Sequence, residues 1–383
     1  MKRLVLFCIA IALLASCSKN EIKISVTNPS AFDRVSELVE ISTEEIAAKL
    51  PLSEGETWLV KNEADEIIPS QITYDGKLVF QAGLTIAATR KFTIFKGAPQ
   101  TFEPKVYGRF ITERYDDFAW ENDRVAFRIY GAALLPIDGP SNGIDAWYKK
   151  TSKLVIDEWY RKDLAGEQSY HSDHGEGLDD FKVGRTLGLG AMAPYINDTL
   201  RLNENFVNQE VLENGPLRLT FRLTYKDLDI DSVKYSEKRT FSLDAGSQLT
   251  KVVQEYGFTK PTPVAAGIVK RENDDIIVFS AENDYLIYQE NSPLAGAIFQ
   301  GVLIPSGIDS TTINKYTIVN PVTKKQETHT HNLAVTKYEP GKPLVYYTGF
   351  GWSQYGFPDL LSFDKYMTDY SKRLSQPLAI YIK

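Results

Sequence analysis

The stretch Arg124-Val125-Ala126-Phe127-Arg128-Ile129-Tyr130 decides the fold class, because its side chains change character at every second position. Successive side chains of an extended strand point to opposite faces of a sheet. Val125, Phe127 and Ile129 therefore share one face, which can enter a core. Both arginines share the other face with Tyr130. The stretch predicts a β-strand with one apolar face and one arginine-bearing face.

The same alternation marks much of the chain, so strands are the main expected element. Further strands are predicted at residues 22–26, 78–80, 91–95, 217–223, 239–243, 249–256, 275–279 and 344–350. In the fourth of these segments, Arg218, Thr220 and Arg222 again share one face. Helical patterns are scarce, and residues 363–374 are the best candidate. The pattern predicts an all-β fold built as an antiparallel sandwich.

The length of the chain and the spacing of its strands indicate two domains. Residues 22–103 carry short strands separated by turns, which predicts a small β-sandwich domain of the immunoglobulin-like kind. Residues 104–383 carry longer strands and are expected to form the large catalytic domain. Few residues of the small domain suggest chemistry, so we expect it to support the large one.

Residues 1–17 have the pattern of a bacterial lipoprotein signal peptide. A basic start is followed by the apolar run 4–14, too short to stay in the membrane as a spanning helix, and then by Cys17. Residues 14–17 resemble a lipobox, in which Cys17 becomes the lipidated first residue. We expect export and attachment by a lipid anchor only, in the periplasm or at the outer membrane or cell surface of a Gram-negative bacterium. Ordinary signal cleavage is the alternative.

Cysteine content and charge exclude several classes of function. The only other cysteine, Cys8, lies in the segment expected to be removed, so no thiol is left for a disulfide, a nucleophile or a thiolate metal site. The hydrophobic content of 43% is typical of a globular protein. The net charge of −7 argues against a nucleic-acid surface, whereas a few local arginines can still bind an acidic sugar.

Residues 170–180, Tyr-His-Ser-Asp-His-Gly-Glu-Gly-Leu-Asp-Asp, are the strongest candidate for an active site, and we name them the histidine loop. They hold two of the four histidines, His171 and His174, beside Tyr170 and Glu176. Two glycines in a segment without hydrophobic period predict a sharply bent loop. Imidazole suits proton transfer near neutral pH, so His171, His174 and Tyr170 are predicted acid–base residues. A polar surface loop with incidental histidines is the alternative.

Residues on either side of the histidine loop are predicted to bind the substrate. Trp120 offers a flat ring for a sugar face, and Asn122 offers hydrogen bonds for hydroxyl groups. Arg124 and Arg128 can pair a carboxylate bidentately. Lys182, like Glu176 within the loop, is a further polar candidate. A core tryptophan beside a charged turn is the alternative.

Two later segments add a histidine pair and aromatic residues. In residues 328–332, an extended backbone puts both histidines on one side, and His331 is a predicted acid–base residue. Residues 350–356 carry Trp352 and Tyr355, which are predicted to stack on a sugar. A packed loop anchor is the alternative for these two aromatic residues.

The motifs for cofactor chemistry are weak. Residues 183–190 are rich in glycine but lack the lysine and hydroxyl of a phosphate loop. The sequence contains no Gly-x-Ser-x-Gly elbow of a serine hydrolase. The spacing of His171 and His174 matches no specific zinc pattern, so no cofactor is expected. A divalent metal near these two histidines is the alternative.

Three runs resemble a family of secreted proteins from polysaccharide-degrading Bacteroidota that is known as a domain of unknown function. They are residues 120–128, 142–147 and 170–177. The family is similar to the galactose-mutarotase-like supersandwiches, an architecture that polysaccharide lyases also use. The resemblance implies an antiparallel β-supersandwich for the large domain. It also implies an activity on uronic-acid oligosaccharides, such as that of an ulvan oligosaccharide dehydratase.

The chemistry of a uronate fits the candidate residues. Its C5 proton lies next to a carboxylate, whose charge must be neutralised before the proton can leave, and the arginines of residues 124–128 or a bound metal can do this. We expect His171 or His174 as one proton-transfer partner and Tyr170 or His331 as the other. A free 4-hydroxyl as leaving group makes the enzyme a dehydratase of a terminal uronate. A glycosidic oxygen makes it a polysaccharide lyase.

Other classes stay open at this point. A non-catalytic glycan-binding lipoprotein would use Trp120, Trp147 and Trp352 as a platform and would not need the histidine pair. An epimerase or mutarotase of the same architecture would leave no unsaturated product. A glycosidase is disfavoured, because no compelling pair of carboxylates is visible in the sequence.

Overall fold

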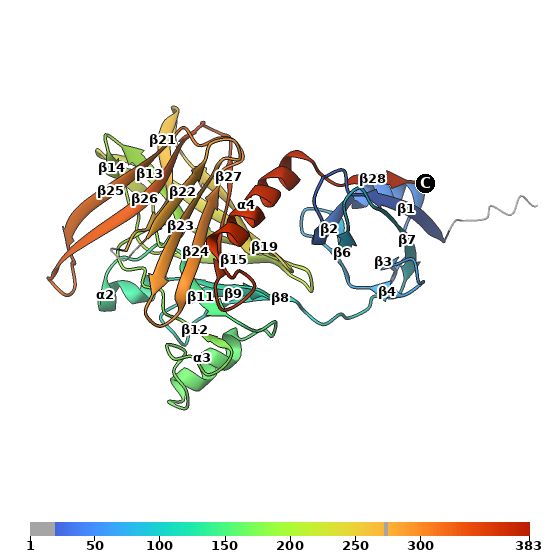
Figure 1. Ribbon diagram of the computed structural model, residues 1–383, viewed down its shortest axis with the longest axis horizontal. Helices are drawn as coiled ribbons and strands as arrows, with labels where there is room; N and C mark the ends of the chain where they lie inside the picture. Colours follow the sequence, from blue (N-terminus) through green and yellow to red (C-terminus); the bar gives the residue numbers. More distant parts are fainter. Residues whose placement is uncertain (1–19, 272–274) are drawn as a thin grey trace, which may run out of the picture.

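The computed structural model describes residues 20–271 and 275–383, which form two β domains (Figure 1). The signal peptide and Cys17 lie outside the described residues. The strands of both domains pair in antiparallel sheets, as the alternating sequence predicts. Within the described residues, no helix has the length and apolar character needed to cross a membrane.

The small domain is a sandwich of two antiparallel sheets, with the strand orders β28-β1-β7-β3-β4 and β2-β6-β5. Its strands are β1 (Glu21–Thr27), β2 (Arg34–Ser42), β3 (Thr57–Lys61), β4 (Ile67–Ile68), β5 (Ser70–Ile72), β6 (Lys77–Leu84), β7 (Thr89–Gly97) and β28 (Ala379–Ile382). Ile24 and Ile94 from one sheet meet Val39 and Phe80 from the other in a core of their own. Helix α1 (Thr43–Lys49) buries Ile46 in the same core.

The last strand of the chain belongs to the small domain, which corrects the predicted boundary of the large domain at residue 383. Strand β28 pairs with β1, and Ile380 lies opposite Val26. Ile380 and Ile382 pack against the core of the small domain. The two ends of the described chain are therefore tied into one sheet, and the helix α4 (Leu360–Ser375) forms a second connection between the domains (Figure 1).

The large domain is an antiparallel supersandwich. Its sheets have the orders β15-β16-β19-β20-β27-β24-β23-β22, β14-β13-β21-β26-β25 and β12-β11-β10-β9-β8, and β17 and β18 form a separate hairpin. The strands are β8 (Val106–Ile111), β9 (Asp117–Asn122), β10 (Ala126–Ile129), β11 (Asp145–Lys149), β12 (Gly177–Leu178), β13 (Leu189–Ile196), β14 (Thr199–Leu200), β15 (Asn208–Asn214), β16 (Arg218–Thr224), β17 (Leu228–Ile230), β18 (Val233–Tyr235), β19 (Glu237–Asp244), β20 (Leu249–Tyr256), β21 (Thr262–Val269), β22 (Ile276–Ser280), β23 (Tyr285–Ser292), β24 (Gly296–Leu303), β25 (Ser310–Val319), β26 (Gln326–Tyr338) and β27 (Leu344–Trp352).

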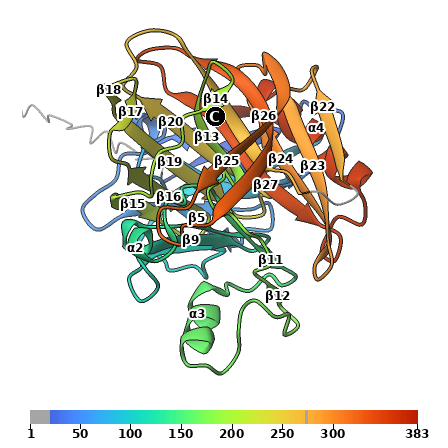
Figure 2. The ribbon, with the colours of Figure 1, turned by 90° about the vertical axis from the view of Figure 1, so that its left-hand side faces the viewer.

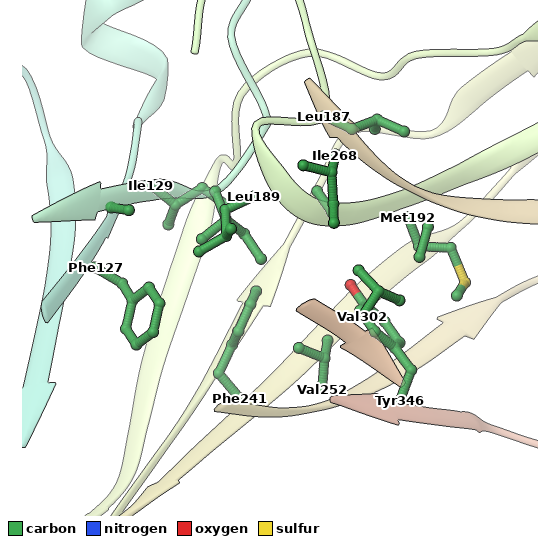
Figure 3. Packing of buried hydrophobic residues seen from close by; sticks show 14 of the residues in the cluster. Phe127, Ile129, Leu187, Leu189, Met192, Phe241, Val252, Ile268, Val302 and Tyr346 are labelled. Atoms are coloured by element: carbon green, nitrogen blue, oxygen red, sulfur yellow. The ribbon is translucent and has the colours of Figure 1, made fainter. Parts of the chain in front are cut away.

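One core joins the three sheets of the large domain. Phe127 and Ile129 from β10 belong to the same buried cluster as Leu189, Phe241 and Val302 from the other two sheets (Figure 3). Their shared face confirms the alternation predicted for residues 124–130. Burial of such a cluster is the main stabilising contribution in a domain of this size.

The other face of β10 is also buried, which differs from the open arginine-bearing face that the sequence indicates. Helix α3 (Ile156–Leu164) and the histidine loop cover it, and Ala126 packs with Ile156 and Trp159. Figure 2 shows α3 next to β12, at the edge of the domain. Arg128 is only 2% exposed as a result. A layer outside the sheet thus turns a predicted surface into an interior.

The predicted C-terminal helix is confirmed as α4. Asp359 and Ser362 form a capping box at its start, which fixes where the helix begins. Phe363 and Met367 face the large domain, and a Cβ added to Gly351 would lie 2.6 Å from Phe363. Glycine at this position of β27 therefore allows the helix to approach the sheet. The short helices η1 (Ala132–Leu134) and α2 (Leu135–Asp138) follow β10.

Candidate active site

The histidine loop leads from α3 into the short strand β12. The N–H of Asp179 donates to the carbonyl of Tyr170 at 2.8 Å and closes the loop. Gly177 has a φ of +123°, and an added Cβ would lie 1.9 Å from the carbonyl oxygen of Tyr148. Only glycine fits this approach between β12 and β11. The second glycine predicted to bend the loop, Gly175, also has a positive φ, of +102°.

Asp173 organises the turn that carries the second histidine. Its carboxylate accepts hydrogen bonds from the N–H groups of Gly175, at 2.8 Å, and of Gly177, at 3.3 Å. The same carboxylate pairs with Lys150, which follows β11. Glu176 is tied to Lys153 at 3.1 Å. Two ion pairs therefore hold the loop against the sheet that β11 belongs to.

Both histidines of the loop have one ring nitrogen bound to a backbone carbonyl. Nε2 of His174 lies 3.1 Å from the carbonyl of Ser169, and Nδ1 of His171 lies 2.9 Å from the carbonyl of Asp179. A carbonyl only accepts, so the bound nitrogen of each neutral ring carries the proton. His174 thus keeps the lone pair on Nδ1, and His171 keeps it on Nε2. Both side chains are exposed and can act as bases.

A hollow of about 320 Å³ lies between the histidine loop and α3. It is lined by three predicted site residues, Tyr170, His174 and Glu176, and by Trp159 and Lys162 of α3. The remaining lining residues are Gln168, Ser169, Ser172, Gly175 and Gly177. A concave site that combines aromatic rings with a few polar groups has the composition of a small-molecule site.

An aromatic stack supports the hollow from below. The rings of Trp159 and Trp147 have centroids 5.4 Å apart, and those of Trp147 and Tyr170 have centroids 4.9 Å apart. Both pairs are close to parallel, with interplanar angles of 22° and 27°. Stacked rings of this size have few rotamers open to them, so the floor of the hollow is rigid.

A cluster of buried charges lies beneath the loop, around Arg128. The guanidinium Nη2 lies 2.5 Å from the carboxylate of Asp145 and 2.7 Å from that of Asp179. Asp117 is also buried, and it lies 3.6 Å from Arg114. His171 lies above the cluster, with Nδ1 3.6 Å from a carboxylate oxygen of Asp179. The cluster therefore connects the interior of the domain with the exposed loop.

Burial changes the ionisation of these carboxyl groups. It raises the pKa of Asp117 to about 7, although Arg128 and Arg114 act in the opposite direction. Burial, together with the nearby charge of Asp145, raises the pKa of Asp179 to about 8. Three carboxylates face two guanidinium groups. One carboxylate is therefore left without a cation, and near neutral pH the cluster holds a proton in place of the missing cation. Strongly perturbed pKa values beside a hollow are typical of functional sites.

Three residues predicted to bind substrate are part of the protein interior instead. Trp120 is fully buried and donates from Nε1 to Thr250 Oγ1 at 3.0 Å. Asn122 is buried and holds the turn after β19 through the carbonyls of Asp244 and Ser247. Trp352 is 2% exposed and donates to the carbonyl of Ala295. Their burial also removes the aromatic platform of the glycan-binding alternative, because Trp147 is fully buried too.

The predicted arginine pair does not form. Arg128 is held by Asp145 and Asp179, and no side of its guanidinium faces solvent. Arg124 is exposed at the turn before β10, where its charge acts on Tyr366 of α4. Alternation along one strand would place the two arginines on the same face, but β10 begins only at Ala126, after Arg124.

Two of the predicted acid–base residues are not placed for proton transfer to a ligand. His331 is fully buried, its Nε2 accepts from the N–H of Leu187 at 3.0 Å, and burial lowers its pKa to about 3. It lies on an extended strand, β26, so the condition for a shared side of the two histidines is met. The hydroxyl of Tyr170 points into the cluster, where Arg128 donates to it at 3.4 Å. The ring of Tyr170, rather than its hydroxyl, borders the hollow.

Lys182 and Tyr355 lie apart from the hollow. Lys182 is exposed, and its carbonyl accepts a hydrogen bond from Arg271. Tyr355 is half-buried and packs against the core of the large domain. This agrees with the alternative of a packed loop anchor. Among the described residues, no three histidine, cysteine or acidic side chains converge as ligands of one metal ion. The expectation of a site without cofactor stays a prediction.

Trp159 and Lys162 complete the hollow, although neither is among the site residues predicted from the sequence. They are three residues apart on α3, a spacing that places both on one side of a helix. The apolar residues Ile156, Trp159 and Tyr160 are the signal that could have revealed this helix. The buried aspartates were also missed, although Asp117 begins a strand that is otherwise apolar for three residues.

The fold and the hollow together define a two-domain β-supersandwich protein with a histidine-bearing pocket. The family described as Domain of unknown function (DUF4861) matches residues 26–380, and the chain belongs to this family. A relative from Formosa agariphila, Uncharacterized protein P7, is 30% identical over 399 residues that cover 98% of each chain.

Two solved structures from Enterococcus faecalis share the architecture. A protein in the Glycosyl Hydrolase Family 38 aligns with a TM-score of 0.54 and 9% identity, and an alpha-mannosidase of strain V583 aligns with 0.51 and 10%. Both alignments cover 95% of this chain, but only 48% and 46% of the two proteins. The chain thus spans about half their length, and the likeness is one of fold.

Proposed function

We propose that the protein is a carbohydrate-active carbon–oxygen lyase that removes the C5 proton of a terminal uronic acid and eliminates the 4-hydroxyl. The observation that carries this proposal is the fixed tautomer of His174, whose Nε2 is bound to the carbonyl of Ser169. The lone pair of Nδ1 is thereby available at a hollow that also contains Lys162 and a rigid aromatic floor. A base and a cation serve the elimination itself, and an aromatic surface serves the binding of the sugar.

The sugar is held by groups of different chemistry on the two sides of the hollow. Trp159 and the ring of Tyr170 contact the apolar face of the sugar, while Ser172 and Gln168 bind its hydroxyl groups. The ammonium group of Lys162, 29% exposed and 3.3 Å from Glu158, pairs with the uronate carboxylate. This pairing lowers the cost of placing more negative charge on the carboxylate.

The elimination then needs one proton carrier. Nδ1 of His174 takes the C5 proton, and the electrons of the C5–H bond form a double bond between C4 and C5. The C4–O bond breaks, and the imidazolium returns its proton to the departing hydroxyl, which leaves as water. The product is a 4,5-unsaturated uronate, and the histidine ends in its starting state. His171 and Asp173 act as positioning residues that hold the loop in place.

The size of the hollow favours a terminal sugar over an internal one. Its volume of about 320 Å³ is at the lower end of the range for small-molecule sites. A polysaccharide lyase acts within a chain and needs a cleft that is open at both ends. The resemblance of residues 170–177 to the family of an ulvan oligosaccharide dehydratase supports the same choice. A lipid-anchored, exported protein would meet such oligosaccharides after other enzymes have cut the polymer.

The proposal is tested by the identity of the products. Purified protein is incubated with uronate-terminated oligosaccharides, and the mixture is followed by ultraviolet absorbance and mass spectrometry. We expect an enoate signal with the loss of one water and an intact chain. Shorter unsaturated fragments would assign a lyase. An inverted C5 without an enoate would assign an epimerase, and no reaction with any acidic oligosaccharide would refute an enzyme of this class.

A further inference from the structure

A second and larger cavity, of about 520 Å³, lies between the two domains. Its walls come from β2 of the small domain, from the outer face of the eight-stranded sheet and from α4. We name it the interdomain cavity. It is remote from the histidine loop, because α3 and α4 lie on different sides of the large domain in both views (Figures 1 and 2). The proposed elimination makes no use of it.

The sheet wall of the interdomain cavity carries a straight row of hydrogen-bonding side chains. Thr220 pairs with Ser242, Ser242 with Lys251, and Lys251 with Tyr347, across β16, β19, β20 and β27. All four side chains line the cavity. Neighbouring strands are about 4.8 Å apart, so the row is about 14 Å long. Thr220 is fully buried, and its hydroxyl bonds to Glu213 and Ser242, so it anchors the end of the row. Ser242, Lys251 and Tyr347 present a hydroxyl, an ammonium and a phenol along one line.

The opposite wall adds apolar surface at the rim. Tyr74 is 52% exposed and Val35 is 77% exposed, and both line the cavity. Ser36 and Glu37 lie next to Val35 on the same wall. A sugar chain has apolar ring faces and hydroxyl edges, and it therefore matches a site with an aromatic rim and a row of polar groups.

The charges of the interdomain cavity decide which kind of sugar it suits. Seven carboxylates line it, namely Asp33, Glu37, Glu40, Asp75, Glu213, Asp244 and Asp369, against five cations, namely Lys77, Arg218, Lys251, Lys365 and Arg373. The central cation, Arg218, is already paired with Asp244 at 2.5 Å and with Glu40 at 2.7 Å. The excess of negative charge repels a polyanion.

We propose that the interdomain cavity is a second carbohydrate-binding site, which takes an uncharged segment of an oligosaccharide. Ser242, Lys251 and Tyr347 bind the hydroxyl edge of the segment, and Tyr74 contacts a ring face at the rim. The site differs from the hollow at the histidine loop, whose cation suits an acidic sugar. The two sites together let the protein hold a glycan in which charged and uncharged residues occur.

The test is isothermal titration calorimetry with neutral hexasaccharides of xylose, glucose, mannose or galactose, and with a hexamer of galacturonic acid. We expect at least one neutral hexasaccharide to bind and S242W, which fills the cavity, to abolish that binding. Y74A should weaken it about fivefold, because an aromatic contact contributes roughly 1 kcal/mol. Y381A serves as the matched control, since Tyr381 is 65% exposed on the same domain but outside the cavity.

The outcomes separate this proposal from the proposed reaction. Circular dichroism establishes that each variant is folded, and Tyr74 is exposed enough for Y74A to fold if S242W does not. H174A should leave the binding of the neutral hexasaccharide unchanged. The proposal is overturned if no neutral hexasaccharide binds, if binding survives both cavity variants, or if H174A abolishes it.

Discussion

Two buried arginines of the large domain have opposite surroundings. Arg239 is fully buried in the sandwich, where Glu237 binds it at 2.7 Å and the carbonyls of Asn142 and Met192 accept its remaining hydrogen bonds. Arg128, beneath the histidine loop, is surrounded by three buried aspartates, two of which bind it directly. The first arginine has one carboxylate, and the second has more carboxylates than it can neutralise.

The difference separates a structural ion pair from a titrating cluster. The pair of Arg239 and Glu237 is satisfied by fixed protein groups, because the carbonyls of Asn142 and Met192 accept from Arg239 and Asn203 donates to Glu237. Around Arg128, one oxygen of Asp117 and one of Asp179 accept no hydrogen bond from any described residue. Burial without enough partners disfavours the charged form, so the pKa values of Asp117 and Asp179 are raised. The cluster next to the exposed histidines is therefore the one whose charge changes near neutral pH.

The largest effect is expected when the ion pair of Arg239 and Glu237 is broken. R239M leaves Glu237 buried without its partner, and we expect a loss of about 3–5 kcal/mol in the free energy of unfolding. Urea denaturation at pH 7 measures it. R222M is the matched control, because Arg222 is 34% exposed and its pair with Glu210 should contribute less than about 1 kcal/mol. Equal losses in the two variants would contradict the structural role of Arg239.

A smaller effect is expected from the titrating cluster. The folded pKa values of about 7 for Asp117 and about 8 for Asp179 lie above the ordinary value of 3.8, so the folded state binds more protons than the unfolded state between about pH 4 and pH 8. Stability should therefore fall as the pH rises through this window. Denaturation at several pH values measures the slope.

The variant D117N sharpens this prediction. Asparagine imitates the protonated carboxyl and does not titrate, so the fall of stability between pH 4 and pH 8 should become shallower. D116N is the control, because its neighbour Asp116 is less buried. A slope that is the same in D117N and in the wild type would show that Asp117 is not protonated in the folded protein.

The smallest effect is expected at the ion pair that holds the histidine loop. Lys150 and Asp173 are 26% and 29% exposed, so K150A should change the free energy of unfolding by less than about 1 kcal/mol. Turnover should fall clearly even though the free energy of unfolding hardly changes, because Asp173 also orders the turn that carries His174. K153A, which removes a more exposed partner of Glu176, is the control for turnover. A large loss of stability in K150A would make the loop a folding element.

The sequence predicts the strands of this protein well, because alternation reports which side chains share a face. Val125, Phe127 and Ile129 enter the core as expected. Alternation says nothing about what covers the second face, where α3 and the histidine loop bury Arg128 and Trp147. The pairing of β28 with β1 joins residues more than 350 positions apart, as Val26 and Ile380 show. No local pattern reports such a contact.

The candidate site is predictable where its residues are neighbours in the sequence. Tyr170, His174 and Glu176 share one loop and line one hollow. Lys162 and Trp159 come from a separate helix, and their contribution depends on how α3 packs against the sheet. His331 is predicted as a site residue but is buried, because the sequence of an extended strand does not show which of its histidines will be covered.

The most direct test of the account compares the two histidines of the loop on one uronate-terminated oligosaccharide. The initial rate of enoate formation is measured for the wild type, H174A and H171A, with each variant's fold established by circular dichroism. The account predicts that H174A loses about 10²- to 10⁴-fold in turnover, the usual contribution of a general base, and that H171A loses much less. A wild-type rate in H174A, or a greater loss in H171A, would contradict the assignment of His174 as the base.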